Sequence, residues 1–135
     1  MKKIFFSLLV LMLSACEIFY PSFTNNRGTS AEYQMISVKE LSQEMVTKDF
    51  LLVNVHIPLE GNIPGTDLDI PYNKIEEKAE LFPADKNAKI ILYCRSGSMG
   101  NRAAQALAGL GYTNVFNLEG GYIAWDAAGY QFPEE

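Results

Sequence analysis

The chain has 135 residues, 48% of them hydrophobic, and a formal net charge of −5 at pH 7. An excess of acidic residues excludes nucleic acid as an expected partner, because phosphate binding needs clustered lysine and arginine. No internal repeat or low-complexity tract is visible in the sequence.

Residues 1–15 have the pattern of an export signal. Two lysines precede an apolar run at residues 4–13 that is too short to cross a bilayer as a helix. The sequence Leu13-Ser14-Ala15-Cys16 then resembles the lipobox of bacterial lipoproteins, in which the cysteine is acylated. We therefore predict a signal peptide, lipidation of Cys16 and a lipid anchor in the bacterial cell envelope, facing an extracytoplasmic space (the periplasm in a Gram-negative cell). The alternative is an ordinary cleaved signal in which Cys16 has no role.

Residues 16–30 show no helix or strand period, and we interpret them as the lipidated N-terminus and a flexible tether reaching on the order of 20 Å. Residues 31–135 are enough for one domain with a core that needs no disulfide. A lipidated Cys16 leaves Cys94 without a cysteine partner, since the chain has two cysteines. That excludes a structural disulfide, a cysteine zinc site and an intramolecular resolving thiol. We expect no metal and no cofactor.

The domain alternates short apolar runs with helical patterns, which is typical of a mainly parallel sheet with helices on both faces. Ser37 and Glu40 form a capping box, and Asn73 and Glu76 form a second one. In chain order, we predict a strand at 33–36, a helix after Ser37 and a strand at 51–55. A helix that starts at residue 73 and stops before Pro83 comes next, followed by a strand at 89–93 and a helix at 101–110. The last elements are a strand at 114–116 and a closing helix with Tyr122, Ala124 and Trp125.

Cys94 lies where the apolar strand at 89–93 breaks into a Ser/Gly loop. The run from Arg95 to Ser98 contains no β-branched or bulky apolar residue, so the loop can curl with several N–H groups inward and form an anion-binding nest. The positive end of the helix expected from Asn101 favours a thiolate. We predict an exposed catalytic cysteine, with the anion bound by the loop residues Arg95, Ser96, Gly97, Ser98, Met99 and Gly100.

Three segments together resemble the rhodanese-like (sulfurtransferase) domain family. They are the Cys94 loop, residues 111–125 with their Gly120-Gly121 pair, and residues 52–58 followed by 61–66, which resemble the family's strand-plus-turn signature. The segments occur in the family's order and cover about residues 33–132. The resemblance implies a three-layer α/β fold with a mainly parallel central sheet flanked by helices.

Four positions depart from the family's usual pattern. Asn54, His56 and Asn62 stand where the family usually has Asp, Arg and His, and Gly100 stands where Ser or Arg is common. The strand end has therefore lost charges that commonly brace the pocket. His56 and Asn54 belong to a strand end at the same sheet edge as Cys94, so we predict that they line the pocket. For His56, the alternative is a loop histidine hydrogen-bonded to the backbone.

The resemblance implies a sulfurtransferase. Cys94 would take a sulfane sulfur from a small anion such as thiosulfate, hold it as a persulfide and pass it to cyanide, a thiol or a protein acceptor. The alternative is a sulfur-carrier, redox-sensing or partner-binding module at the membrane surface, without turnover. A phosphatase or arsenate reductase is disfavoured, because Gly100 occupies the position where those enzymes need an arginine. The sulfurtransferase prediction requires a thiol that is ionised at neutral pH and accessible to solvent.

Overall fold

The computed structural model describes residues 32–133, so the predicted signal peptide, tether and lipidated Cys16 lie outside the described residues. Its centre is a five-stranded sheet in the order β1-β5-β4-β2-β3, and all four strand pairings are parallel. The α/β fold with a parallel central sheet is therefore confirmed. In chain order the elements are β1 (Gln34–Ile36), α1 (Val38–Glu44), the 3-10 helix η1 (Met45–Thr47), β2 (Leu51–Asn54), β3 (Leu68–Asp69), the 3-10 helix η2 (Ala79–Leu81), β4 (Ile90–Tyr93), α2 (Ser98–Gly109), β5 (Val115–Leu118) and α3 (Gly121–Ala127).

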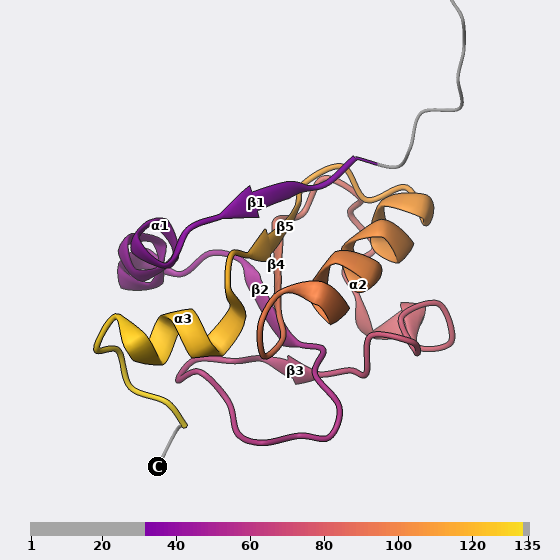
Figure 1. Cartoon of the computed structure of the whole chain (residues 1–135). Helices are drawn as coiled ribbons and strands as arrows, with labels where there is room; N and C mark the ends of the chain where they lie inside the picture. The colour runs from indigo at the N-terminus through magenta and orange to yellow at the C-terminus, as the bar shows by residue number, and fades with distance from the viewer. Residues whose placement is uncertain (1–31, 134–135) are drawn as a thin grey trace, which may run out of the picture.

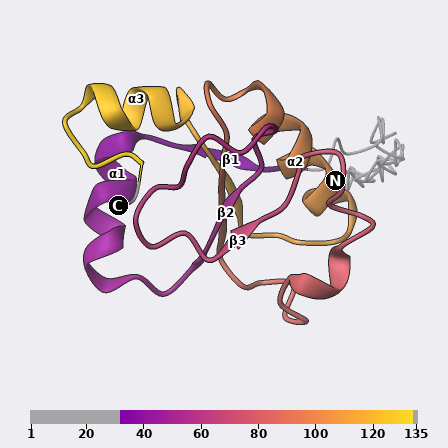
Figure 2. The same cartoon turned by 90° about the horizontal axis from the view of Figure 1, so that it is seen from below.

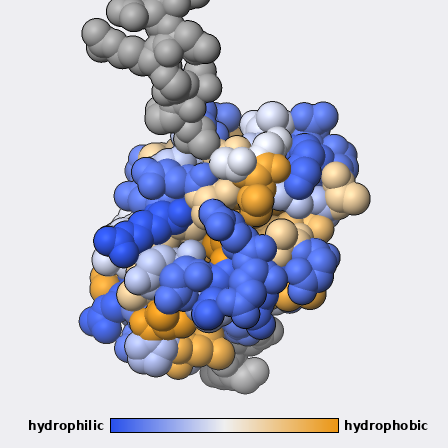
Figure 3. All heavy atoms as spheres, turned by 90° about the vertical axis from the view of Figure 1, so that its right-hand side faces the viewer, coloured by the Kyte–Doolittle hydropathy of each residue, from blue (hydrophilic) through white to orange (hydrophobic). Residues whose placement is uncertain are grey.

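Helices cover both faces of the sheet. α1 and α3 lie together on one face, and α2 with the segment between β3 and β4 lies on the other (Figures 1 and 2). Each face has its own apolar core, with Leu41 and Trp125 in one and Phe82 and Leu107 in the other. All four residues of β4 are buried, which explains why the sequence of this strand is apolar without alternation. The outer surface on the α2 side is mainly hydrophilic (Figure 3).

The capping box at the start of α1 is confirmed. The Ser37 hydroxyl accepts the Glu40 N–H at 3.2 Å, and the Glu40 carboxylate accepts the Ser37 N–H at 2.9 Å. Two of the N–H groups that a helix leaves without partners at its start are satisfied in this way. The box fixes the point at which the chain leaves β1 and turns over the sheet.

The second predicted capping box and its helix are wrong. Residues 73–78 form turns, and the helical piece between them and Pro83 is the three-residue η2. The turns are held by bonds such as Lys74 N–H to the Pro71 carbonyl at 2.8 Å. Two prolines bound this segment, and so short a helix is unstable without a broad packed face. We did not predict strand β3 from the sequence, because its two residues are too few to show the alternation of apolar and polar side chains that marks a strand.

Helix α2 begins at Ser98, three residues before the predicted start at Asn101. Gly97 has a φ of 116°, and this left-handed turn lets the helix start immediately after the loop. The end agrees with the prediction, because α2 stops at Gly109 and Gly111 supplies a left-handed residue with φ of 96°. Within residues 32–133, no helix combines the length and the apolar character needed to cross a membrane.

Candidate active site

Cys94 directly follows β4, the middle strand of the sheet, at the edge where parallel sheets bind ligands. Its sulfur accepts the N–H of Gly97 at 3.0 Å and the N–H of Gly100 at 3.3 Å. α2 begins between these two donors, so the positive end of the helix also faces the sulfur. Inward main-chain donors around a lone sulfur are the groups that a sulfur anion needs.

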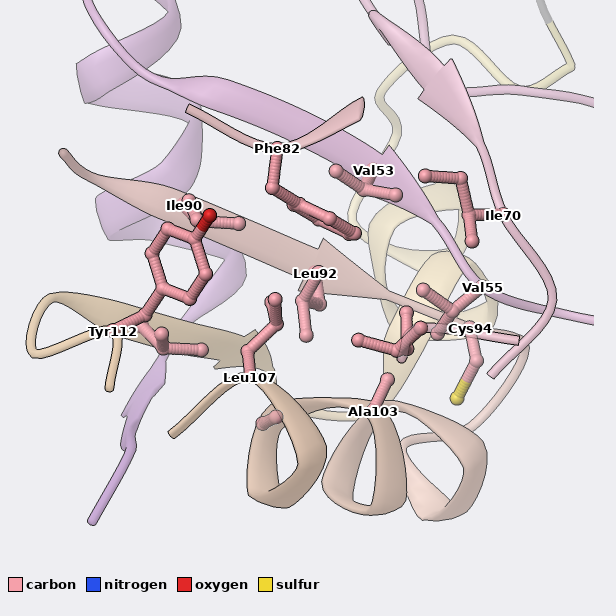
Figure 4. Packing of buried hydrophobic residues seen from close by; sticks show 13 residues of the cluster. Val53, Val55, Ile70, Phe82, Ile90, Leu92, Cys94, Ala103, Leu107 and Tyr112 are labelled. Carbon is pink, nitrogen blue, oxygen red and sulfur yellow. The ribbon is translucent and has the colours of Figure 1, made fainter. Parts of the chain in front are cut away.

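The predicted exposure of Cys94 is wrong. The residue is 1% exposed and packs in the core on the α2 side, where Val55, Ile70 and Ala103 are its neighbours in the same cluster (Figure 4). The main-chain donors of the loop and the core side chains on the α2 side together cover Cys94 in this structure.

Helix α3 holds the other side of the loop through main-chain bonds. The N–H of Tyr122 donates to the Cys94 carbonyl at 2.9 Å, and the N–H of Ile123 donates to the Arg95 carbonyl at 3.1 Å. Gly121 has a φ of 59°, and a Cβ there would lie 2.3 Å from the Cys94 carbonyl oxygen. The close approach of α3 to the loop therefore requires glycine at this position.

Asn117 supports the loop from below. This side chain of β5 is fully buried, and its Nδ2 donates to the Gly97 carbonyl at 3.0 Å and to Asn101 Oδ1 at 2.8 Å. Asn117 Oδ1 has no hydrogen-bond partner among the described residues and lies against Gly100, where a Cβ would be 2.0 Å away. Gly100 stands where the family usually has Ser or Arg, and its lack of a side chain leaves the space that Asn117 occupies.

Asn54 belongs to an amide network at the end of β2. Its Nδ2 donates to the Gly61 carbonyl at 3.0 Å and to Asn62 Oδ1 at 2.8 Å, while its Oδ1 accepts the N–H of His56 at 3.0 Å. Tyr93 adds its hydroxyl to the same network, 3.3 Å from Asn62 Oδ1. Burial raises the pKa of Tyr93 to about 12. Asn62 Nδ2 also donates to the Asp69 carboxylate at 3.2 Å. Amide hydrogen bonds thus brace the turn at positions where the family usually has charged side chains.

His56, Arg95 and Tyr122 converge on one oxygen of Glu60. Arg95 Nη1 lies 3.5 Å and His56 Nε2 lies 3.7 Å from Glu60 Oε2, and the Tyr122 hydroxyl donates to the same atom. The hydrogen bond from Tyr122 lowers the pKa of Glu60, and the charges of Arg95 and His56 act in the same direction. Burial, together with the bond to Glu60, raises the pKa of Tyr122. The imidazole of His56 also meets the Tyr122 ring edge-on at 5.7 Å.

A groove of about 350 Å³ lies beside the loop. Glu60, Arg95 and Tyr122 line one part of it, and Asp126 and Phe132 line another. The other predicted loop residues divide by exposure: Ser96 and Ser98 are exposed, Met99 is half-buried against the α2-side core, and Gly97 and Gly100 are buried. Among the described residues, the hydrogen bonds to the sulfur come from the main-chain N–H groups of Gly97 and Gly100.

The sequence of the domain matches a known family. The family model of the rhodanese-like domain matches residues 37–128. The chain belongs to the rhodanese-like domain family. A sulfurtransferase of Allochromatium vinosum is 38% identical over 94 residues, covering 67% of this chain and 85% of that protein. The thiosulfate sulfurtransferase GlpE of Ectopseudomonas mendocina is 40% identical over 108 residues, covering 78% and 93%.

Solved structures show the same fold. A rhodanese-related protein from Thermoplasma volcanium superposes with a TM-score of 0.64 at 27% identity, covering 73% of this chain and 96% of that chain. A rhodanese-like domain protein from Staphylococcus aureus superposes with a TM-score of 0.63 at 26% identity, covering 76% and 100%. This protein is therefore a rhodanese-like domain, and its named relatives include sulfurtransferases.

Two residues that contact the site were not singled out in the sequence. Asn117 is a polar residue inside an apolar strand, and a buried amide in a strand signals a specific hydrogen-bond partner. Glu60 follows His56 by four residues, but the chain bends at Pro58 between them. Such a segment has no helix or strand period from which the contact could be predicted. Within residues 32–133, no three His, Cys, Asp or Glu side chains gather as metal ligands would.

Two glycines of α2 provide a matched test of the loop support. Gly100→Ala is expected to destabilise the rhodanese-like domain by about 1–3 kcal/mol, because the new Cβ overlaps Asn117. Gly109→Ala is expected to stabilise it by up to about 1 kcal/mol, since nothing lies within 4 Å of its Cβ position. Urea denaturation of both variants measures the difference. Equal effects of the two substitutions would contradict the packing of Asn117 against Gly100.

The Glu60 contacts predict a pH dependence of stability. The folded state lowers the pKa of Glu60 below its usual 4.5, so it stabilises the carboxylate form. This contribution is complete above pH 4.5 and is lost as the pH falls through the lower folded-state value. The stability difference between wild type and Glu60→Gln should therefore be largest at neutral pH and shrink below about pH 4.5. Denaturation curves at a series of pH values measure it, and a difference that grows on acidification would be inconsistent with these contacts.

Proposed function

We propose that this rhodanese-like domain transfers a sulfane sulfur from a donor such as thiosulfate to cyanide or a thiol through a persulfide on Cys94. The observation that carries the proposal is the pair of hydrogen bonds from the N–H groups of Gly97 and Gly100 to the Cys94 sulfur. Main-chain donors fixed around a nucleophile stabilise negative charge without reorganising during the reaction. The relatedness to named sulfurtransferases supports the same activity.

The reaction takes two displacement steps. In the first, the Cys94 thiolate attacks the outer sulfur of thiosulfate, the S–S bond of thiosulfate breaks, and sulfite leaves with the bonding electron pair. Cys94 then carries a terminal persulfide anion, held by the same N–H groups. In the second step, cyanide attacks the terminal sulfur, thiocyanate leaves, and the Cys94 thiolate is restored. Covalent catalysis of this kind gives ping-pong kinetics.

The burial of the sulfur favours a second candidate, a sulfur-carrier, redox-sensing or partner-binding module without significant turnover. Cys94 is 1% exposed, so little of it is open to a small donor in this structure. The amide network around Asn54 and Asn62 also supplies no positive charge for attracting a small anion, and Asn62 Nδ2 donates to the Asp69 carboxylate at 3.2 Å. In contrast, phosphatase chemistry is disfavoured, because Asn117 leaves no space for a clamping side chain at Gly100.

A thiosulfate:cyanide assay tests the proposal. Wild type should form thiocyanate, and Cys94→Ser should lose all of this activity, because the persulfide cannot form. Gly109→Ala is the control: it lies at the other end of α2 with nothing within 4 Å of the new Cβ, and it should fold and react normally. Incubation with thiosulfate should also add about 32 Da to Cys94 in mass spectra. Absence of both Cys94-dependent thiocyanate and the adduct would leave the carrier or binding module as the function.

We further propose that Cys16 is acylated and anchors the domain in the bacterial cell envelope, facing an extracytoplasmic space. The motif at residues 13–16 supports this proposal, and two or more acyl chains suffice for stable attachment. Mass spectrometry of the mature protein should find an N-terminal, acylated Cys16, and Cys16→Ser should move the protein from the membrane to the soluble fraction. An intact Met1 or an unmodified Cys16 would overturn the anchor.

A further inference from the structure

One carboxylate oxygen determines the charge beside the Cys94 loop. Glu60 Oε2 lies 3.5 Å from Arg95 Nη1 and accepts the Tyr122 hydroxyl, with His56 Nε2 at 3.7 Å. The side chains of Arg95 and Glu60 are 55% and 41% exposed, and both line the groove beside the loop.

The ion pair changes the net charge of this groove. Arg95 is the residue after the nucleophile, and its guanidinium would attract a dianion such as thiosulfate. Glu60 is ionised at neutral pH, since its three contacts all favour the carboxylate, and it cancels the charge of Arg95. Asp126 lines the same groove and adds another negative charge. The lining of the groove therefore carries two carboxylates and one guanidinium.

We infer that Glu60 determines donor specificity: by pairing with Arg95 it disfavours dianionic sulfur donors and selects sulfane-sulfur compounds without net negative charge, such as the persulfide of a cationic thiol, in which the cation offsets the persulfide anion. This inference rests on the proposed function, because it concerns which donor delivers sulfur to Cys94. Glu60 acts through the field at the loop and through Arg95, without touching the sulfur. Removal of its charge should raise the rate with dianions and lower the rate with cations.

The kinetic test uses a Cys16→Ser chain, in which Cys94 is the only cysteine. Glu60→Gln should raise kcat/KM for thiosulfate about three- to tenfold at low ionic strength, the size expected for one charge acting on a dianion across several ångströms of solvent. The gain should fall away near 1 M salt, where screening is nearly complete. Adding Arg95→Ala to Glu60→Gln should remove the gain, because the freed guanidinium is its source.

Glu77→Gln is the matched control. Glu77 pairs with Lys74 at 2.8 Å, so it is also an exposed carboxylate in an ion pair, but it lies in the segment between β3 and β4. This variant should leave kcat/KM for thiosulfate unchanged. An equal gain in Glu77→Gln would indicate an effect of total charge and would overturn the role of Glu60.

A second measurement separates this inference from the proposed function, because it needs no turnover. Cys94 is modified with an anionic and with a cationic methanethiosulfonate, the sulfonatoethyl and trimethylammonioethyl reagents, and the ratio of the two rates is compared between variants. Glu60→Gln should raise the anionic-to-cationic ratio about three- to tenfold. A merely structural role, in which loss of the Tyr122 contact loosens the loop, would raise both rates equally and leave the ratio unchanged.

The outcomes are distinct. An unchanged ratio together with unchanged kcat/KM for thiosulfate, in a protein that forms thiocyanate, would overturn the role of Glu60 and leave the proposed function standing. A Cys94 that reacts with neither reagent and yields no thiocyanate would overturn the proposed function and, with it, this inference. A raised ratio in a protein without thiocyanate formation would show that Glu60 controls access of charge to Cys94, whereas the thiosulfate reaction would be rejected.

Discussion

The hydrogen bonds from the N–H groups of Gly97 and Gly100 to the Cys94 sulfur exist only while the loop keeps its tight curve. That curve is held mainly by main-chain groups. α3 donates two N–H groups to the carbonyls of Cys94 and Arg95, and Asn117 donates its amide to the Gly97 carbonyl. Because these contacts end on the backbone, they do not depend on the exposed side chains of Arg95, Ser96 and Ser98.

Close packing of the backbone explains the small residues around the site. α3 can approach the Cys94 carbonyl only with glycine at position 121, and Asn117 can support the loop only with glycine at position 100. The same packing buries the sulfur. The rhodanese-like domain thus combines main-chain donors to the Cys94 sulfur with close packing that leaves the residue only 1% exposed.

Two features set the charge around the site. At the end of β2, Asn54 and Asn62 form amide hydrogen bonds at positions where the family usually has Asp and His. Beside the loop, Glu60 Oε2 lies 3.5 Å from Arg95 Nη1, so the carboxylate offsets part of the positive potential of the guanidinium. The main-chain donors of the sulfur are thus independent of the side chains that set the local charge.

The sequence by itself determined the parallel α/β fold, the strand that ends at Cys94 and the capping box at Ser37, because these depend on local periodicity and on turn chemistry. It did not determine the start of α2, since the left-handed turn at Gly97 is compatible with several helix starts. The turns at residues 73–78 were wrongly predicted as a helix, because a capping pattern does not show whether a packed face is available. The tertiary structure alone decided the burial of Cys94, the support from Asn117 and the convergence of Arg95, His56 and Tyr122 on Glu60. These contacts join residues that are far apart in the chain or lie in irregular loops, and neither case leaves a period in the sequence.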